Sequence, residues 1–478
     1  MNTRTLLRVA GFVPLLILSN LVAACSSKEG QAQEALSAYQ AAAAAGDLQG
    51  ARQALATLVA VDEDNAEYWV ELGQLHAQAG AFNDAFYAFG RAHELDRGNA
   101  NVLQALTQLA LRGGALEQAE DYAQQLELLS PADPAVKLTN GYVALRRGDA
   151  ESAGRYADQL LALSPYDSAA RVLKARALLR QNKGEEAIAL LEEQARLQPS
   201  DGASLRALFG LLQRRDDWAR MMVYGRRLLA LVPDDPKLAR DVIEAALRAG
   251  DVATARQLTL EKLEKDLTSG QAAELLDVWA ELRPNSAFNA DVRRLAAAAP
   301  NDRKLVLASF LNRVGDARAA VTLTQPLATL PVTAENTTAN AIYAAALSQL
   351  GQREAASDRL NQVLSLDPGH IEALRARTQL ALALRQPNRA TKDAQRLVSV
   401  SPADAASWIL LARVHAAIGN QEEAGRTLWN GFHQISADRN IYEALRVYVA
   451  RTQGAEGARR VDQEFADQRD ALMAREFV

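Results

Sequence analysis

Apolar and small residues recur along the chain with a period of 34 residues. One alanine position makes the period visible, and it is occupied by Ala51, Ala85, Ala119, Ala153, Ala187, Ala255, Ala356, Ala390, Ala424 and Ala458. Met221 occupies the same position one period before Ala255, and a short shift in register precedes Ala356. A fixed period of this length indicates stacked copies of one supersecondary unit. We therefore expect a solenoid and not a globular domain with a cleft.

Each period predicts two helices, helix A and helix B, because a stop signal follows each of them. Glycines that can take a left-handed backbone conformation end helix A at Gly46, Gly80, Gly114, Gly148, Gly250, Gly315, Gly351 and Gly419. Prolines follow helix B and stop it at Pro131, Pro165, Pro233, Pro300, Pro368 and Pro402. Aspartates stand at the N-cap of the next helix A, at Asp133, Asp167, Asp235 and Asp404. Alanine, leucine, glutamine, glutamate and arginine dominate the composition, which also favours an all-α fold.

The second period carries its signature residues in the order Trp69, Leu72, Gly73, His76, Gly80, Ala85, Phe89 and Ala92. This order resembles the W-x2-L-G-x2-Y, alanine, phenylalanine and alanine pattern of tetratricopeptide (TPR) repeats. Near the C-terminus the same frame returns in Trp408, Leu411, Ala412, His415, Gly419, Ala424 and Leu428. The resemblance covers roughly residues 32–470 and implies a right-handed superhelix, an α-solenoid of about thirteen 34-residue helix-turn-helix units.

The units at about residues 202–336 depart from this signature. Other units have a small residue at one position of helix A, such as Gly73 or Ala412. Here that position is occupied by Phe209, Ile243 and Asp277, and the alanine position of helix B is occupied by Met221 and Phe288. An extended loop is expected at 326–338. Two interpretations stay open: drift in which neighbouring side chains compensate for the larger residues, or a change of curvature or a hinge that separates two binding lobes.

The N-terminus predicts a secretory signal peptide. Arg4 and Arg8 precede an apolar run at residues 9–18, which is too short to span a membrane comfortably. The sequence that ends this segment, Leu-Val-Ala-Ala before Cys25, resembles the bacterial lipobox. The resemblance implies cleavage before Cys25, lipidation of its thiol and stable anchoring by several acyl chains. The alternative is an ordinary signal peptide with a chance cysteine, although Cys25 is the only cysteine in the chain.

These features predict four segments: a lipoprotein signal peptide at 1–24, a lipidated N-terminus and short tether at 25–31, the solenoid at 32–470 and a tail at 471–478. Ser26 and Ser27 follow the cysteine, where aspartate commonly signals retention at the inner membrane in lipoproteins of Gram-negative bacteria. Its absence implies, again by resemblance, a lipoprotein of the outer membrane that faces the periplasm.

Charge argues against nucleic-acid binding. Loss of Arg4 and Arg8 with the signal peptide leaves 51 basic and 58 acidic residues, a net charge of −7. Arginines recur at the last turn of helix A, at Arg112, Arg146, Arg180, Arg214 and Arg248. We call these five residues the arginine ladder. They are candidate groove residues for an anionic partner, but a cation is also favoured there by the helix macrodipole alone.

Sequence motifs of catalysis are missing. The chain has no H-E-x-x-H, G-x-S-x-G, Walker A or G-x-G-x-x-G sequence, and its five histidines show no metal-ligand spacing. His76 and His415 occupy a packing position of the repeat. We therefore expect no enzyme activity, no metal and no cofactor.

The expected solenoid shape and the expected location in the cell envelope together suggest a function. A long solenoid offers an extended surface that binds peptides, helices or whole proteins. The leading hypothesis is a non-enzymatic scaffold lipoprotein that assists an envelope machine for exopolysaccharide export, secretion or pilus assembly, with an export porin or a pilus or secretion component as partner. The alternative is a periplasmic carrier or chaperone for unfolded or polymeric cargo. A third option is an accessory protein that docks peptidoglycan enzymes.

The lipobox yields a direct prediction. Cys25→Ala removes the thiol that would carry the lipid, so we expect an uncleaved or soluble precursor in cell fractionation. Ser26→Ala keeps the cysteine and serves as the control. A Cys25→Ala protein that stays in the membrane fraction, processed as the unaltered chain is, would contradict the anchoring hypothesis.

Overall fold

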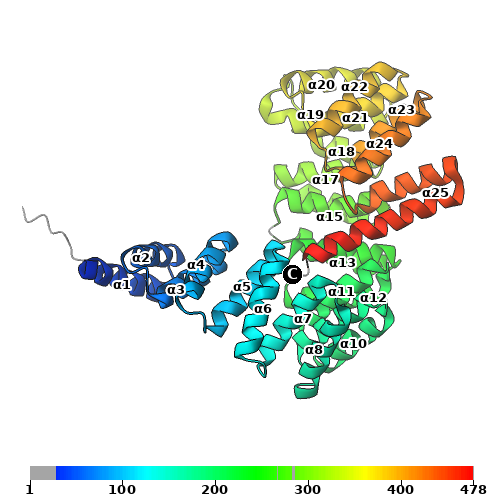
Figure 1. Cartoon of the computed structure of the whole chain (residues 1–478). Coiled ribbons are helices and arrows are strands. Elements are labelled where there is room, and N and C mark those ends of the chain that lie inside the picture. Colours follow the sequence, from blue (N-terminus) through cyan, green and yellow to red (C-terminus); the bar gives the residue numbers. More distant parts are fainter. Residues whose placement is uncertain (1–27, 266, 283–285, 477–478) are drawn as a thin grey trace, which may run out of the picture. The chain divides into compact units, whose positions relative to one another are not determined.

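The computed structural model describes residues 28–265, 267–282 and 286–476, and these residues are helical with no strand (Figure 1). They form thirteen helix pairs, counting α25 as two helices that meet at the non-helical Gly454. The all-α repeat fold predicted from the 34-residue period is thereby confirmed. The expected signal peptide 1–24 and Cys25 lie outside the described residues.

The chain divides into two compact units, one that ends at Arg147 and one that begins at Gly148. The N-terminal unit contains α1 (Lys28–Ala45), α2 (Leu48–Val61), α3 (Ala66–Gln78), α4 (Phe82–Leu95), α5 (Ala100–Gly113), α6 (Leu116–Leu129) and α7 (Pro134–Arg147). Because α1 begins at Lys28, the second half of the segment expected as a tether is helical.

The C-terminal unit contains the remaining helices. Its first half is α8 (Ala150–Leu163), α9 (Ser168–Arg180), α10 (Gly184–Leu197), α11 (Gly202–Arg214), α12 (Trp218–Leu231), α13 (Pro236–Arg248), α14 (Val252–Leu263), α15 (Ser269–Leu282) and α16 (Ser286–Ala298). Its second half is α17 (Asn301–Arg313), α18 (Ala317–Thr324), the short 3-10 helix η1 (Ala334–Asn336), α19 (Thr337–Gln349), α20 (Arg353–Leu366), α21 (Ile371–Ala383), α22 (Pro387–Val400), α23 (Ala405–Ala417), α24 (Gln421–Gln434) and α25 (Arg439–Glu476). No described helix is both long enough and apolar enough to cross a bilayer.

Helix ends follow the predicted signals. All eight glycines predicted to end helix A have a positive φ, between 71° and 91°. The predicted N-cap aspartates accept backbone N–H groups of the helix that follows, as Asp133 does from Ala135 at 2.8 Å. Three repeats place another residue at the glycine position in the same left-handed conformation: Asn182, Asp216 and Arg385.

Small residues lie where helix A and helix B of a repeat pack together. The repeating alanine is buried in every repeat named above, with at most 6% of its surface exposed. In the second repeat Gly73 of α3 packs against Phe89 of α4, since a Cβ atom on Gly73 would lie only 3.0 Å from the Phe89 ring. The two helices therefore approach as closely as their small residues allow.

The units with the degenerate signature keep helix A and helix B in contact in two ways: by an exchange of residue size and by the stacking of two rings. In α11 the large Phe209 replaces the small residue, and in α12 Gly225 lies against it, where a Cβ would come within 2.6 Å of the Phe209 ring. In α15 and α16, Trp279 and Phe288 stack with ring centroids 3.8 Å apart, and both are buried. The structure thus supplies the compensation that sequence drift requires.

A turn hydrogen bond recurs between repeats with different residues. Trp69, Lys137, Arg171 and Trp408 each donate a side-chain N–H to the backbone carbonyl six residues earlier, at 2.8–3.0 Å. Each bond satisfies a carbonyl of the turn that leads into helix A. Lysine and arginine can therefore replace the signature tryptophan without loss of this contact.

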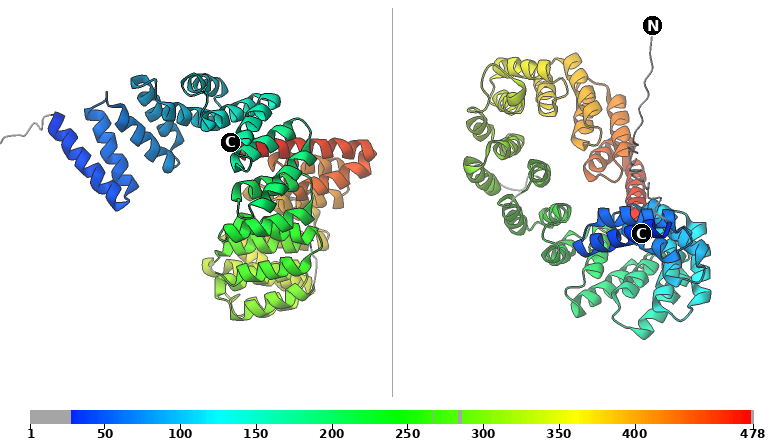
Figure 2. Two further views of the ribbon diagram at one scale, coloured as in Figure 1. Left: turned by 90° about the horizontal axis from the view of Figure 1, so that it is seen from below. Right: turned by 90° about the vertical axis from the view of Figure 1, so that its left-hand side faces the viewer.

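The repeats of the C-terminal unit follow a curve that has an inner and an outer side (Figure 2). Successive A helices contact one another directly through α13, α15, α17, α19 and α21, whereas among the described B helices α16 and α18 make the one substantial contact of this kind. The A helices are therefore on the concave face, and the B helices are splayed outward.

The exchange of residue size between Phe209 and Gly225 predicts that a glycine-to-alanine substitution has opposite effects on stability at Gly225 and at Gly154. Gly225→Ala should lower the free energy of unfolding by about 1–3 kcal/mol, because the new methyl group overlaps Phe209 and Val242. Gly154→Ala, in α8 of the same unit, meets its neighbours at 3.7 Å or more, and should raise stability by about 0.5–1 kcal/mol. Denaturant unfolding of both variants tests this, and equal effects would contradict the proposed packing.

Candidate protein-binding surface

The inner face of the C-terminal unit carries many charged side chains, and they pair with one another. Arg248 in α13 contacts the Glu244 carboxylate at 2.8 Å. Arg313 in α17 pairs with Asp277 in α15. Farther along, Arg375 in α21 lies 3.1 Å from Asp404. A surface of this kind is polar but already neutralised in large part, so a partner must compete with internal ion pairs.

Asp241 is a half-buried acid of this face. Its side chain is 15% exposed, and Arg240 lies 3.4 Å away. Burial raises the pKa of Asp241 to about 6, with Arg240 opposing and Glu244 adding to the shift. A carboxyl group with this pKa loses its proton close to neutral pH, and it carries a penalty for burial once it is charged.

The arginine ladder is distributed over both compact units. In the N-terminal unit, the guanidinium of Arg112 stacks over the Phe82 ring at 3.8 Å, and Arg146 is exposed to solvent. Stacking of Arg112 is a cation–π contact that the sequence did not suggest. It fixes the side chain of Arg112 against α4.

Within the C-terminal unit the three other members differ in environment. Arg180 at the end of α9 is exposed, Arg214 is half-buried, and the side chain of Arg248 is only 13% exposed. Arg248 also lies 3.3 Å from Glu443 of α25. The spacing of Glu244 and Arg248, four residues apart on one helix, is a sequence signal for their pairing. No sequence signal marks Glu443, which is 195 residues away.

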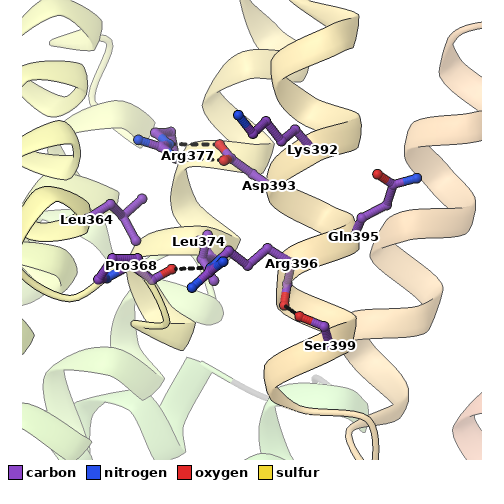
Figure 3. Close-up of a pocket in the computed structure, with 9 residues that line it drawn as sticks. All are labelled: Leu364, Pro368, Leu374, Arg377, Lys392, Asp393, Gln395, Arg396 and Ser399. Atoms are coloured by element: carbon purple, nitrogen blue, oxygen red, sulfur yellow. Dashed lines mark hydrogen bonds and ion pairs between the residues drawn. The ribbon is translucent and has the colours of Figure 1, made fainter.

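Cavities in the described residues are shallow and open. The first, of about 500 Å³, is lined by residues of α20, α21 and α22 and of the turn between α20 and α21 (Figure 3). Three of its polar side chains engage protein groups: Arg377 binds Asp393 through two bonds of 2.7 Å, and Arg396 donates to the Pro368 carbonyl at 2.8 Å. A site for a small molecule needs polar groups that converge. Lys392 and Gln395, which also line this cavity, point away from each other (Figure 3).

Metal ligands do not gather in the part of the chain that the structure describes. No cluster of three or more histidine, cysteine, aspartate or glutamate side chains is positioned to hold a metal ion there. The concave surface of the A helices is the candidate binding surface.

Comparison with known families agrees with this architecture. Models of the tetratricopeptide repeat match residues 36–101, 144–211 and 375–428. The chaperone protein YscY of Yersinia enterocolitica is 36% identical over 76 residues, which is 16% of this chain and 67% of YscY. The chain therefore belongs to the tetratricopeptide-repeat proteins, a class that binds protein partners through its helical surfaces.

Solved structures give weaker likenesses. A tetratricopeptide repeat protein from Parabacteroides merdae ATCC 43184 shares 16% identity, with 52% of this chain and 98% of that one covered and a TM-score of 0.42. Yeast Tom70 shares 13% identity, with 86% and 94% covered and a TM-score of 0.34. MamA of Desulfovibrio magneticus RS-1 shares 14% identity, with 37% and 99% covered and a TM-score of 0.34. Similarity at this level says nothing about what the chain binds.

The raised pKa of Asp241 predicts how stability depends on pH. Its folded pKa of about 6 exceeds the unfolded value of about 3.9, so the folded state holds this proton longer. The free energy of unfolding therefore falls as pH rises from about 4 to 6. Asp241→Asn should raise it by up to about 3 kcal/mol at pH 7.5 and have little effect near pH 4.

Asp251, the N-cap of α14, is the control, because its pKa is shifted in the opposite direction. The backbone N–H of Thr254 lowers the pKa of this carboxyl group, so its stabilising effect is present at neutral pH and is lost on acidification. Denaturant unfolding of Asp241→Asn and Asp251→Asn at the two pH values should give shifts of opposite direction. A gain from Asp241→Asn that is equal at both pH values would be inconsistent with the burial penalty.

Proposed function

We propose that this chain is a non-enzymatic scaffold that binds a protein partner along the concave face of its A helices. The observation that carries the proposal is the direct succession of A helices through α13, α15, α17, α19 and α21, which presents one extended polar face. An extended peptide or a helix matches a surface of this form better than a small molecule does. The open cavities support the same choice.

The proposed location is the outer membrane, with the solenoid in the periplasm and an anchor at Cys25. This part rests on the sequence alone: the charged and apolar segment of residues 1–18, the small residues before Cys25 and the serines that follow it. In this setting the partner is a protein of the cell envelope, such as an export porin or a component of a pilus or secretion system.

The arginine ladder supports an anionic partner segment. Arg180 is its most accessible member in the C-terminal unit, since Arg248 is engaged with Glu244 and Glu443. An acidic peptide that reaches Arg180 would gain a charged contact at the rim, where such contacts influence association rate and specificity.

A second candidate function is that of a carrier or chaperone. Its support is the likeness of part of the chain to YscY, a protein named as a chaperone. The two candidates differ in their clients: a scaffold holds one stoichiometric partner, whereas a general chaperone binds many unfolded proteins.

Crosslinking in intact cells separates them. The chain is purified with its anchor in place after crosslinking, and partners are identified by mass spectrometry. One dominant envelope component would support the scaffold, and a diffuse set of periplasmic clients would overturn it in favour of the carrier.

A substitution in the arginine ladder then tests the partner chemistry. Arg180→Gln should weaken binding of an acidic partner about tenfold, because it removes one accessible cation. Arg155→Gln, on the outer helix α8, removes an exposed arginine from the opposite side of a repeat and should leave binding unchanged. Affinity measured with the purified partner would refute the anionic model if both variants bound like the unaltered chain.

A further inference from the structure

The last repeat returns to a repeat in the first half of the C-terminal unit. α25 packs on α23 and α24 through an apolar cluster that includes Leu445, Val449 and Phe465. The same helix also reaches the edge formed by α11, α12 and α13, about 195–253 residues earlier in the chain. Both views show α25 alongside this part of the unit (Figures 1 and 2).

Asp216 is the centre of this second contact. It occupies the turn between α11 and α12, in the left-handed conformation (φ 57°) that most other repeats assign to glycine. Arg439 at the start of α25 binds its carboxylate, and Arg469 lies 3.3 Å from the same oxygen. Arg469 also donates to the backbone carbonyl of Gln213. A glycine here would be easier for the backbone but would offer no carboxylate.

A second set of contacts lies next to the first. Glu443, one turn along α25 from Arg439, is 3.3 Å from Arg248 of α13. The guanidinium groups of Arg248 and Arg439 both lie over the Trp218 ring, at 5.4 Å and 5.0 Å from its centroid. Glu443 thus gives Arg248, a member of the arginine ladder that already pairs with Glu244, a second carboxylate from a distant repeat.

The chemistry of this contact differs from that of the repeat stack. Within the described residues, the apolar cluster of α23–α25 and the one that extends from α9 to α13 share no member. Charges and cation–π contacts hold α25 to α11–α13, while buried alanines and leucines hold each repeat to the next. Salt weakens partly exposed ion pairs far more than it weakens apolar packing.

We propose that α25 is a reversible ionic clasp that closes the C-terminal unit on itself, with Asp216 as its fixed anion and Arg439, Arg469 and Glu443 as the moving groups. In the closed state the clasp occupies Arg248 and the α11–α13 end of the inner face. In the open state this end is available to a partner. The clasp does not depend on the identity of that partner, so it is tested without one.

A distance measurement tests the proposal on the full chain. Spin labels are attached through unnatural amino acids at exposed positions 230 in α12 and 466 in α25, which leaves Cys25 unaltered. At low salt we expect one short distance. Asp216→Gly should reduce the ratio of closed to open molecules about tenfold, since each arginine loses a charged acceptor. Salt at 1 M should act in the same direction on the unaltered chain.

Asn182→Gly is the matched control. Asn182 occupies the same left-handed turn position one repeat earlier (φ 61°) and contacts neither arginine, so its replacement relieves the same backbone strain. It should leave the distance unchanged. Both glycine variants should keep a cooperative melting transition, which separates opening of the clasp from unfolding. A short distance that survives Asp216→Gly and 1 M salt would overturn the clasp.

Discussion

The close approach of helix A to helix B is the constraint on which the rest of the structure depends. A helix pair of this size cannot bury its apolar face alone, so each repeat needs both its partner helix and its neighbours. Small residues at the crossing permit the approach. Where Phe209 enlarges one side, Gly225 reduces the other. The repeat therefore tolerates a changed signature provided that the two sides change together.

The turn between the two helices has a separate role. Its left-handed residue contributes little to packing, since a Cβ at Gly148 or Gly250 would meet no atom within 4 Å. The position is thus open to substitution at the cost of backbone strain alone. Asp216 accepts that strain and places a carboxylate at the edge of the unit, where α25 meets it. This turn position contributes little to packing within its own repeat, but at Asp216 it provides the contact between two distant repeats.

Charge on the inner face is organised by the same geometry. A helices stand close together there, so a carboxylate on one repeat can reach a cation on another, as Asp277 reaches Arg313. The periodic arginines are therefore not equivalent: Arg180 remains exposed, while Arg248 is held by Glu244 and Glu443. A partner of the concave face would meet a surface whose charges differ from one repeat to the next.

The sequence by itself determined the repeat, its helix ends and its internal contact, because these depend on residues within one 34-residue period. Periodicity, glycine at the left-handed turn and alanine at the crossing are local signals, and the structure follows them. The sequence could also name the arginine ladder, but not the environment of its members. Only the tertiary structure decided that Glu443 pairs with Arg248 and that Arg439 and Arg469 meet Asp216. These pairs join residues about 195–253 positions apart, and such separations are set by the accumulated curvature of the stacked repeats, which no local pattern records.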